Sequence, residues 1–125
     1  MNTKVIMIAS ALFNAVIGLT CSFMPQEILS YVGINEINFL TLIIQLLGAL
    51  YLGFAILNWM AKSNLIGGIY SKPVALGNFL HYMVGGLALV TYFINHQDLT
   101  ILLIPTIIYA VLAVLFGKVA FGSPI

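Results

Sequence analysis

The residue of this sequence with the clearest capacity for chemistry is His81, which lies inside a long apolar segment beside Tyr82. An ionisable group in such a segment is a candidate for function when the segment crosses a membrane. A neutral imidazole can equally hold two helices together by hydrogen bonds, which requires no further role. Both interpretations of His81 are open from the sequence.

Other polar side chains lie about as far along their apolar segments as His81 does, so they would be at a similar depth in the membrane and could contact it. Asn14 is about ten residues into its segment, His81 about eight, and Tyr109 about eleven from the other side, which places them within ~5 Å of one plane. A donor or acceptor left in hydrocarbon costs several kcal/mol, so we expect a shared mid-membrane polar pocket. The alternative for each amide is a hydrogen bond between helices. The candidate binding residues are Asn14, Gln45, Asn78, His81, Tyr82 and Tyr109.

Several common kinds of site lack the residues they need. The apolar segments contain no aspartate or glutamate, and the chain contains no arginine and a single cysteine. His96 is the only other histidine and falls outside the apolar segments, so no histidine pair has haem or metal spacing. We therefore assign no catalytic residue, no metal and no cofactor. A non-enzymatic role is favoured over an enzyme.

The composition indicates that lipid is the solvent for most of this chain. Of its 125 residues 62% are hydrophobic and only 6% are charged, whereas a soluble domain carries about a quarter charged residues. The net charge is +1 without a basic cluster, so nucleic acid is not expected as a partner.

Four segments are long and apolar enough to cross a membrane as helices, because a spanning helix needs about 20 residues. They predict an all-α fold, an integral membrane antiparallel bundle of four transmembrane helices that forms one domain over residues 1–125. The predicted spans are residues 5–24, 39–61, 74–94 and 99–121.

The charged residues sort by side of the membrane. Short loops that carry lysine stay in the cytoplasm, which predicts that both termini are inside. The lysines Lys4, Lys62, Lys72 and Lys118 fall on the predicted inner side, and Glu27, Glu36 and Asp98 fall on the outer side.

Proline and glycine predict the ends of helices. Pro25 opens a short run that Gly33 ends, and we expect an amphipathic helix here in the outer headgroup region. It is interpreted as a connecting helix that seals the bundle, with a lid over an outward-facing pocket as the alternative. Pro73 should open the third span, and Pro105 should kink or loosen the fourth near Ile101.

Small and polar residues at spacings of three or four predict the inward faces of the spans, because close approach and hydrogen bonds hold helices together in lipid. On the first span these residues are Ser10, Asn14, Gly18 and Cys21, and on the second they are Thr41, Gln45, Gly48, Ala55 and Asn58. On the third span they are Gly77, His81 and Gly85, and on the fourth they are Thr106, Ala110, Ala113 and Gly117.

The first apolar segment ends near Cys21 and has an alternative interpretation as a lipoprotein signal. The preceding residues Gly18-Leu19-Thr20 fit such a cleavage site poorly, since Thr20 is larger than the usual small residue. We therefore expect a permanent helix.

The stretch from Met24-Pro25-Gln26-Glu27-Ile28-Leu29 to Gly33, followed by Gln45-Leu46-Leu47-Gly48-Ala49 and Gly53, resembles the DoxX-like group of small four-helix bacterial membrane proteins. The resemblance covers the first half of the chain and implies the bacterial cytoplasmic (inner) membrane. In that group an arginine often stands where this chain has Gln45, so the resemblance carries no anion-related role. It implies in some cases an accessory subunit of a quinone-linked oxidoreductase.

Three functions are compatible with these patterns. The favoured one is a non-enzymatic accessory or binding protein for lipid or a hydrophobic ligand, with membrane lipid, a hydrophobic small molecule or quinone, a larger membrane complex or a homo-oligomer as possible partners. The second is a small oligomeric channel or transporter. The third is a lipid- or quinone-modifying enzyme that uses His81 with Tyr82 or Tyr109.

Overall fold

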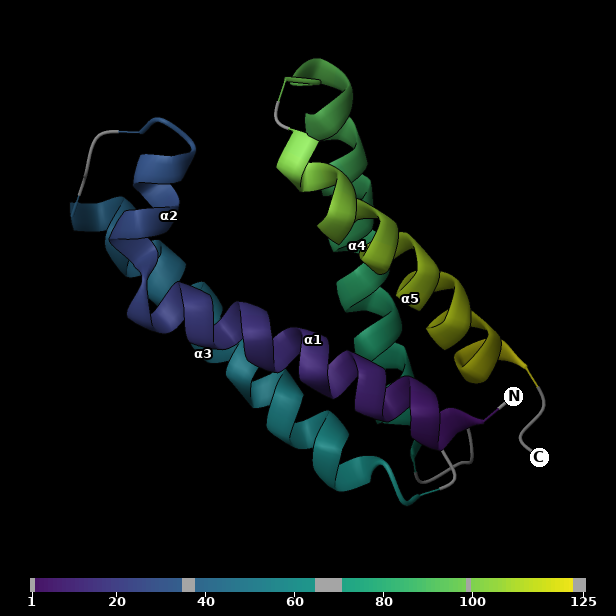
Figure 1. Ribbon diagram of the computed structural model, residues 1–125. Helices are drawn as coiled ribbons and strands as arrows, with labels where there is room; N and C mark the ends of the chain where they lie inside the picture. The colour runs from purple at the N-terminus through teal and green to yellow at the C-terminus, as the bar shows by residue number, and fades with distance from the viewer. Residues whose placement is uncertain (1, 35–37, 65–70, 99, 123–125) are drawn as a thin grey trace. The chain divides into compact units, whose positions relative to one another are not determined.

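The computed structural model describes residues 2–34, 38–64, 71–98 and 100–122, and these residues form helices joined by turns, with no strand among them. Figure 1 shows the chain coloured along its length. The helices are α1 (Thr3–Phe23), α2 (Pro25–Tyr31), α3 (Asn38–Ala61), α4 (Lys72–Asn95) and α5 (Leu103–Phe121), with a short 3-10 helix, η2 (Thr100–Leu102), before α5.

Four of these helical segments are long and apolar enough to cross a membrane, which confirms the prediction of a multi-pass, all-helical chain. The candidate spans are Thr3–Phe23, Phe39–Ala61, Lys72–Asn95 and Thr100–Phe121. Their ends fall within two residues of the predicted ends, because apolar length and proline positions are properties of the local sequence.

The first break in the helices follows from Pro25. The residue before a proline is driven out of the α conformation, and Met24 has φ −132° and ψ 48° there. Pro25 then begins α2. The first N–H groups of a helix have no acceptor within it, so the N–H that proline lacks is not missed here. The helix ends in a Schellman motif, in which Gly33 (φ 81°) donates to Ser30 and Ile34 donates to the carbonyl of Leu29.

Two further prolines lie in first turns of helices. Pro73 is in the first turn of α4, as predicted. Pro105 is in the first turn of α5, since the preceding residues Thr100–Leu102 take the tighter 3-10 geometry. The disturbance of the helix expected near Ile101 therefore takes the form of a 3-10 helix just before α5. Because Pro105 lies in the first turn of α5, it interrupts no α-helical hydrogen bond to an earlier turn.

The structure divides into two compact units, which are described separately. Met7–Ala61 forms the first, here named the α1–α3 unit, and Met1–Ile6 with Lys62–Ile125 forms the second, the α4–α5 unit. The prediction of one antiparallel bundle over residues 1–125 stays a prediction.

In the α1–α3 unit, α1 and α3 pack antiparallel through small residues. A Cβ added at Gly18 would lie 2.8 Å from Leu52, and one added at Gly48 would lie 2.8 Å from the backbone nitrogen of Ser22. The later position in α1, Ser22, therefore meets the earlier position in α3, Gly48, as antiparallel packing requires. Such close approach is the way helices gain dispersion energy in lipid, where burial of apolar surface contributes little.

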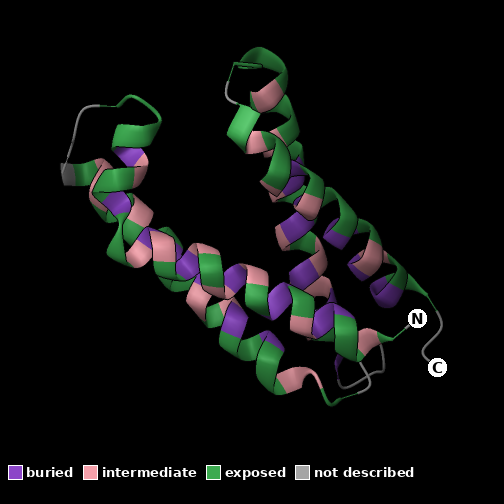
Figure 2. Cartoon of the chain, viewed as in Figure 1, coloured by how far each residue is buried: buried purple, intermediate pink, exposed green. Residues whose placement is uncertain are grey.

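In the α4–α5 unit, the two helices also run antiparallel, and aromatic side chains fill the space between them. Phe79 packs edge-on against Phe121 with ring centroids 5.2 Å apart, and Tyr82 stacks on Phe116 at 5.7 Å. Tyr82 and Phe116 are fully buried. Figure 2 shows buried positions recurring along both helices, so this pair has a core of its own.

Candidate functional site

The candidate site in the α4–α5 unit is a cluster of three rings, His81, Tyr82 and Tyr109. The Nε2 atom of His81 lies 3.0 Å from the hydroxyl of Tyr109. The ring centroids of His81 and Tyr82 are 4.7 Å apart, and those of Tyr82 and Tyr109 are 5.2 Å apart, both in edge-to-face geometry. Each ring therefore contacts the other two.

Gly85 determines where the ring of Tyr109 lies. His81 and Gly85 are four residues apart and so share a face of α4. A Cβ at Gly85 would lie 2.5 Å from Cε2 of Tyr109, closer than atoms can approach. The absence of a side chain at Gly85 lets the ring of Tyr109 rest on α4 with its hydroxyl one turn away, at His81.

The hydrogen bond of His81 can run in either direction. The tyrosine hydroxyl donates when Nε2 carries no proton, and Nε2–H donates to the hydroxyl oxygen in the other tautomer. Tyr109 is buried and His81 is half-buried. The pair satisfies two polar groups within an apolar span, and it has the atoms needed to pass a proton.

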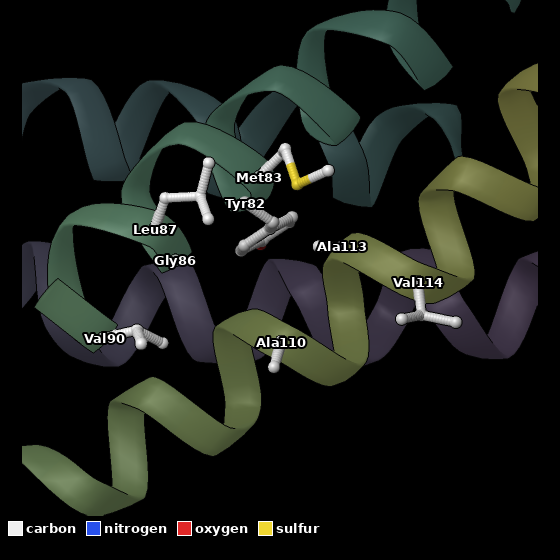
Figure 3. Close-up of a pocket in the computed structure, with 8 residues that line it drawn as sticks. All are labelled: Tyr82, Met83, Gly86, Leu87, Val90, Ala110, Ala113 and Val114. Carbon is white, nitrogen blue, oxygen red and sulfur yellow. The ribbon is translucent and has the colours of Figure 1, made fainter.

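An apolar groove lies on the other side of Tyr82, between α4 and α5. It has a volume of about 230 Å³. The small residues Gly86, Ala110 and Ala113 leave the space, and longer apolar side chains border it (Figure 3). Tyr82 both lines the groove and contacts His81, so it connects the groove with the ring cluster. The lining residues are Tyr82, Met83, Gly86, Leu87, Val90, Ala110, Ala113 and Val114.

Asn78 lies on α4 about one turn before Tyr82 and is fully buried. Its Nδ2 donates to the carbonyl oxygen of Val74 at 3.0 Å. This bond to its own helix satisfies one donor of the amide inside the span.

The α1–α3 unit contains a polar cluster that sequence patterns did not single out. The hydroxyl oxygen of Ser10 accepts from Nδ2 of Asn58 at 2.9 Å and from Nδ2 of Asn14 at 3.3 Å. All three side chains are fully buried. Ser10 and Asn58 were placed on inward faces from the sequence, but nothing in the spacing of either helix indicates that they meet each other.

The six predicted site residues therefore fall into separate groups. His81, Tyr82 and Tyr109 come together, and Asn78 is near them on α4. Asn14 and Gln45 belong to the α1–α3 unit. Gln45 was predicted to face inward; within the α1–α3 unit it is exposed on α3, and its inward position in a four-helix bundle stays a prediction. The shared pocket of Asn14 with His81 stays a prediction.

Sequence reasoning also missed the groove and Phe116. The only signals were the stripe with Ala110 and Ala113 and the adjacent glycines Gly85 and Gly86. Small residues indicate close helix packing as readily as an open groove, so the stripe alone cannot separate the two.

In the parts of the chain that the structure describes, no three side chains of His, Cys, Asp or Glu lie close enough to hold a metal ion. The ring nitrogen Nε2 of His81 faces a tyrosine hydroxyl, an arrangement that suits hydrogen bonding to a ligand or a proton relay.

The chain matches no protein-family model, no curated protein and no solved structure. The resemblance to the DoxX-like group therefore remains an expectation that rests on the residues quoted for it.

Proposed function

We propose that this chain is a membrane protein that binds one hydrocarbon chain of a lipid or another hydrophobic molecule in the groove between α4 and α5. In this proposal it acts as a binding or accessory protein and performs no reaction on the ligand. The observation that carries the proposal is the apolar groove of about 230 Å³ on a candidate membrane span.

The size of the groove supports a narrow ligand. Pockets for compact drug-sized molecules have volumes of roughly 300–1,000 Å³, and this groove is smaller. Met83 and Leu87 border it with flexible side chains, and Met in particular adapts to irregular shapes. A slender, flexible hydrocarbon chain fits such a groove better than a rigid ring system does.

The test is to fill the groove and to measure labelling by a photoreactive lipid. Ala110→Leu adds three carbon atoms at the lining, and Ala88→Leu adds the same atoms at an exposed site of α4 outside it. At about 0.8 kcal/mol for each displaced CH₂, Ala110→Leu should weaken binding by about 2 kcal/mol, or roughly thirtyfold.

The assay uses a diazirine-bearing palmitic acid in liposomes, with adducts located by peptide mass spectrometry. We expect adducts at Met83 or Leu87 in the wild type and in Ala88→Leu, and few in Ala110→Leu. Even labelling of all exposed apolar residues, unchanged by Ala110→Leu, would contradict the proposal.

A lipid- or quinone-modifying enzyme is the second candidate, and one observation favours it. The distance of 3.0 Å between His81 Nε2 and the Tyr109 hydroxyl suits proton transfer. The test compares the lipid and quinone content of cells that express the wild type, His81→Gln or no protein. A compound that changes only with the wild type would favour the enzyme, and identical extracts would exclude it.

We further propose that both termini lie in the cytoplasm. Lys72 begins α4 and Lys118 lies in the last turn of α5, so both belong to one end of this antiparallel pair, and Asp98 follows the other end. The positive-inside rule supports this orientation. The resemblance to the DoxX-like group is the sole support for a bacterial inner membrane.

The helix α2 then lies on the outer side. Pro25 and Leu29 are buried, whereas Gln26, Glu27 and Tyr31 are exposed, which is the one-sided pattern of a helix at the headgroup boundary. A connecting role for α2 is consistent with its short length of seven residues.

A further inference from the structure

Gln45 differs from the other amide side chains in the interior of the candidate spans. Asn14, Asn58 and Asn78 are fully buried and hydrogen bonded. Within the α1–α3 unit Gln45 is exposed, and its side chain makes no hydrogen bond to the residues that the structure describes there. The helix pair of α1 and α3 therefore leaves this amide without a partner.

The depth of Gln45 makes this exposure costly. The middle residue of the span Phe39–Ala61 is Leu50, and Gln45 lies five residues from it, or ~7.5 Å at 1.5 Å per residue. The hydrocarbon layer extends roughly 15 Å to each side of its midplane. An amide at this depth has no water to bond with, and leaving it unpaired costs several kcal/mol.

The surroundings of Gln45 on α3 allow a second helix to approach. Ala49 and Gly53 follow it at four-residue spacing, and both are exposed. A Cβ added at Gly53 would meet no atom within 4 Å, so the space above it is open. This face is turned away from Gly48 and Ala55, which are buried. We name it the Gln45 face, and it consists of Leu42, Gln45, Ala49, Gly53, Ile56 and Met60, all exposed.

We propose that the chain forms a homodimer in which the Gln45 faces of two copies pack together and the two Gln45 amides bond to each other. In a two-fold dimer whose axis is normal to the membrane, both copies keep the same orientation. A residue near the axis then meets its own counterpart at the same depth.

The amide of Gln45 selects a second copy as the occupant because it is self-complementary. It carries both donors and an acceptor, so two copies satisfy each other. Lipid acyl chains have neither a hydrogen-bond donor nor an acceptor, so they cannot satisfy the amide. Leu42, Ala49 and Ile56 follow one another at seven-residue intervals on this face. A seven-residue repeat is typical of helices that pack at a small crossing angle.

Single-cysteine cross-linking tests the interface in native membranes. Cys21 is the only cysteine, so a Cys21→Ala chain is a clean background. We expect oxidation to give disulfide-linked dimers of Ala49→Cys and Gly53→Cys. The controls Leu47→Cys and Leu50→Cys, which are exposed on other sides of α3, should give several-fold less. Equal dimer yields at all four positions, or no dimer at any, would overturn the proposal.

A second measurement tests the role of the amide. Energy transfer between labelled copies in liposomes, followed as the protein is diluted with lipid, gives the dimer dissociation constant. Gln45→Leu should raise this constant roughly fivefold, and Gln45→Asn should keep it near the wild-type value. Helical content should stay unchanged in both, since Gln45 is exposed and makes no hydrogen bond within its own unit. An unchanged constant in Gln45→Leu would show that the amide does not join the copies.

Discussion

Replacement of Gly48 by alanine is the most direct test of how α1 and α3 pack. A Cβ at this position would lie 2.5 Å from the hydroxyl oxygen of Ser22, 2.8 Å from its backbone nitrogen and 3.0 Å from Cβ of Cys21. A hydroxyl can rotate away, but the backbone nitrogen moves only if α1 shifts as a whole. The matched control is Gly53→Ala on the same helix, where the new methyl group would meet nothing within 4 Å.

The two substitutions share one effect and differ in another. Alanine in place of glycine in a helix interior gains about 1 kcal/mol through backbone entropy, and this gain applies at both positions. Overpacking costs about 1–3 kcal/mol and applies only at Gly48. Gly48→Ala should therefore be less stable than Gly53→Ala by about 1–3 kcal/mol, and Gly48→Leu should be less stable still.

The measurement is reversible unfolding by SDS in mixed micelles. Trp59 is the only tryptophan and lies on α3, so its fluorescence reports on this unit. Detergent in excess keeps the copies in separate micelles, which removes any contribution from association. If Gly48→Ala proves as stable as Gly53→Ala, the close approach of α3 to the backbone of Ser22 is wrong.

Three further predictions use the polar groups and the charges. Ser10→Ala removes the acceptor of two buried amides and should cost on the order of 2 kcal/mol in SDS unfolding, whereas the exposed Ser30→Ala should change stability by less than about 0.5 kcal/mol. Tyr109→Phe removes the hydrogen-bond partner of His81 and should shift the ¹⁵N resonance of Nε2, and an unshifted resonance would refute the bond. Alkaline phosphatase fused after Lys118 should be inactive and a fusion directly after α2 active, and the reverse pattern would invert the proposed orientation.

The structure also shows where an inward-facing prediction depends on more than spacing. Gly48 and Gln45 were placed on one inward stripe from the sequence, yet within the α1–α3 unit Gly48 is buried and Gln45 is exposed. Small and polar residues both suit helix contacts in lipid. The spacing does not say whether a given contact is with a helix of the same pair or with something else.

The four spans and their ends were predictable from the sequence alone, because each depends on neighbours along the chain. Apolar length, the proline at position 25 and the glycine at position 33 act locally. His81 could also be recognised as unusual, since a titratable ring in an apolar segment needs no partner to be noticed.

Only the tertiary structure determined which polar groups meet. The bonds of His81 with Tyr109 and of Ser10 with Asn58 join residues 28 and 48 positions apart. They depend on the rotation of each helix about its axis and on its shift along the partner. In a chain whose lipid-facing and inward-facing residues are both apolar, hydropathy sets neither quantity. Steric fit at Gly48 and Gly85 sets both, because a Cβ there would prevent the approach that brings these side chains within reach.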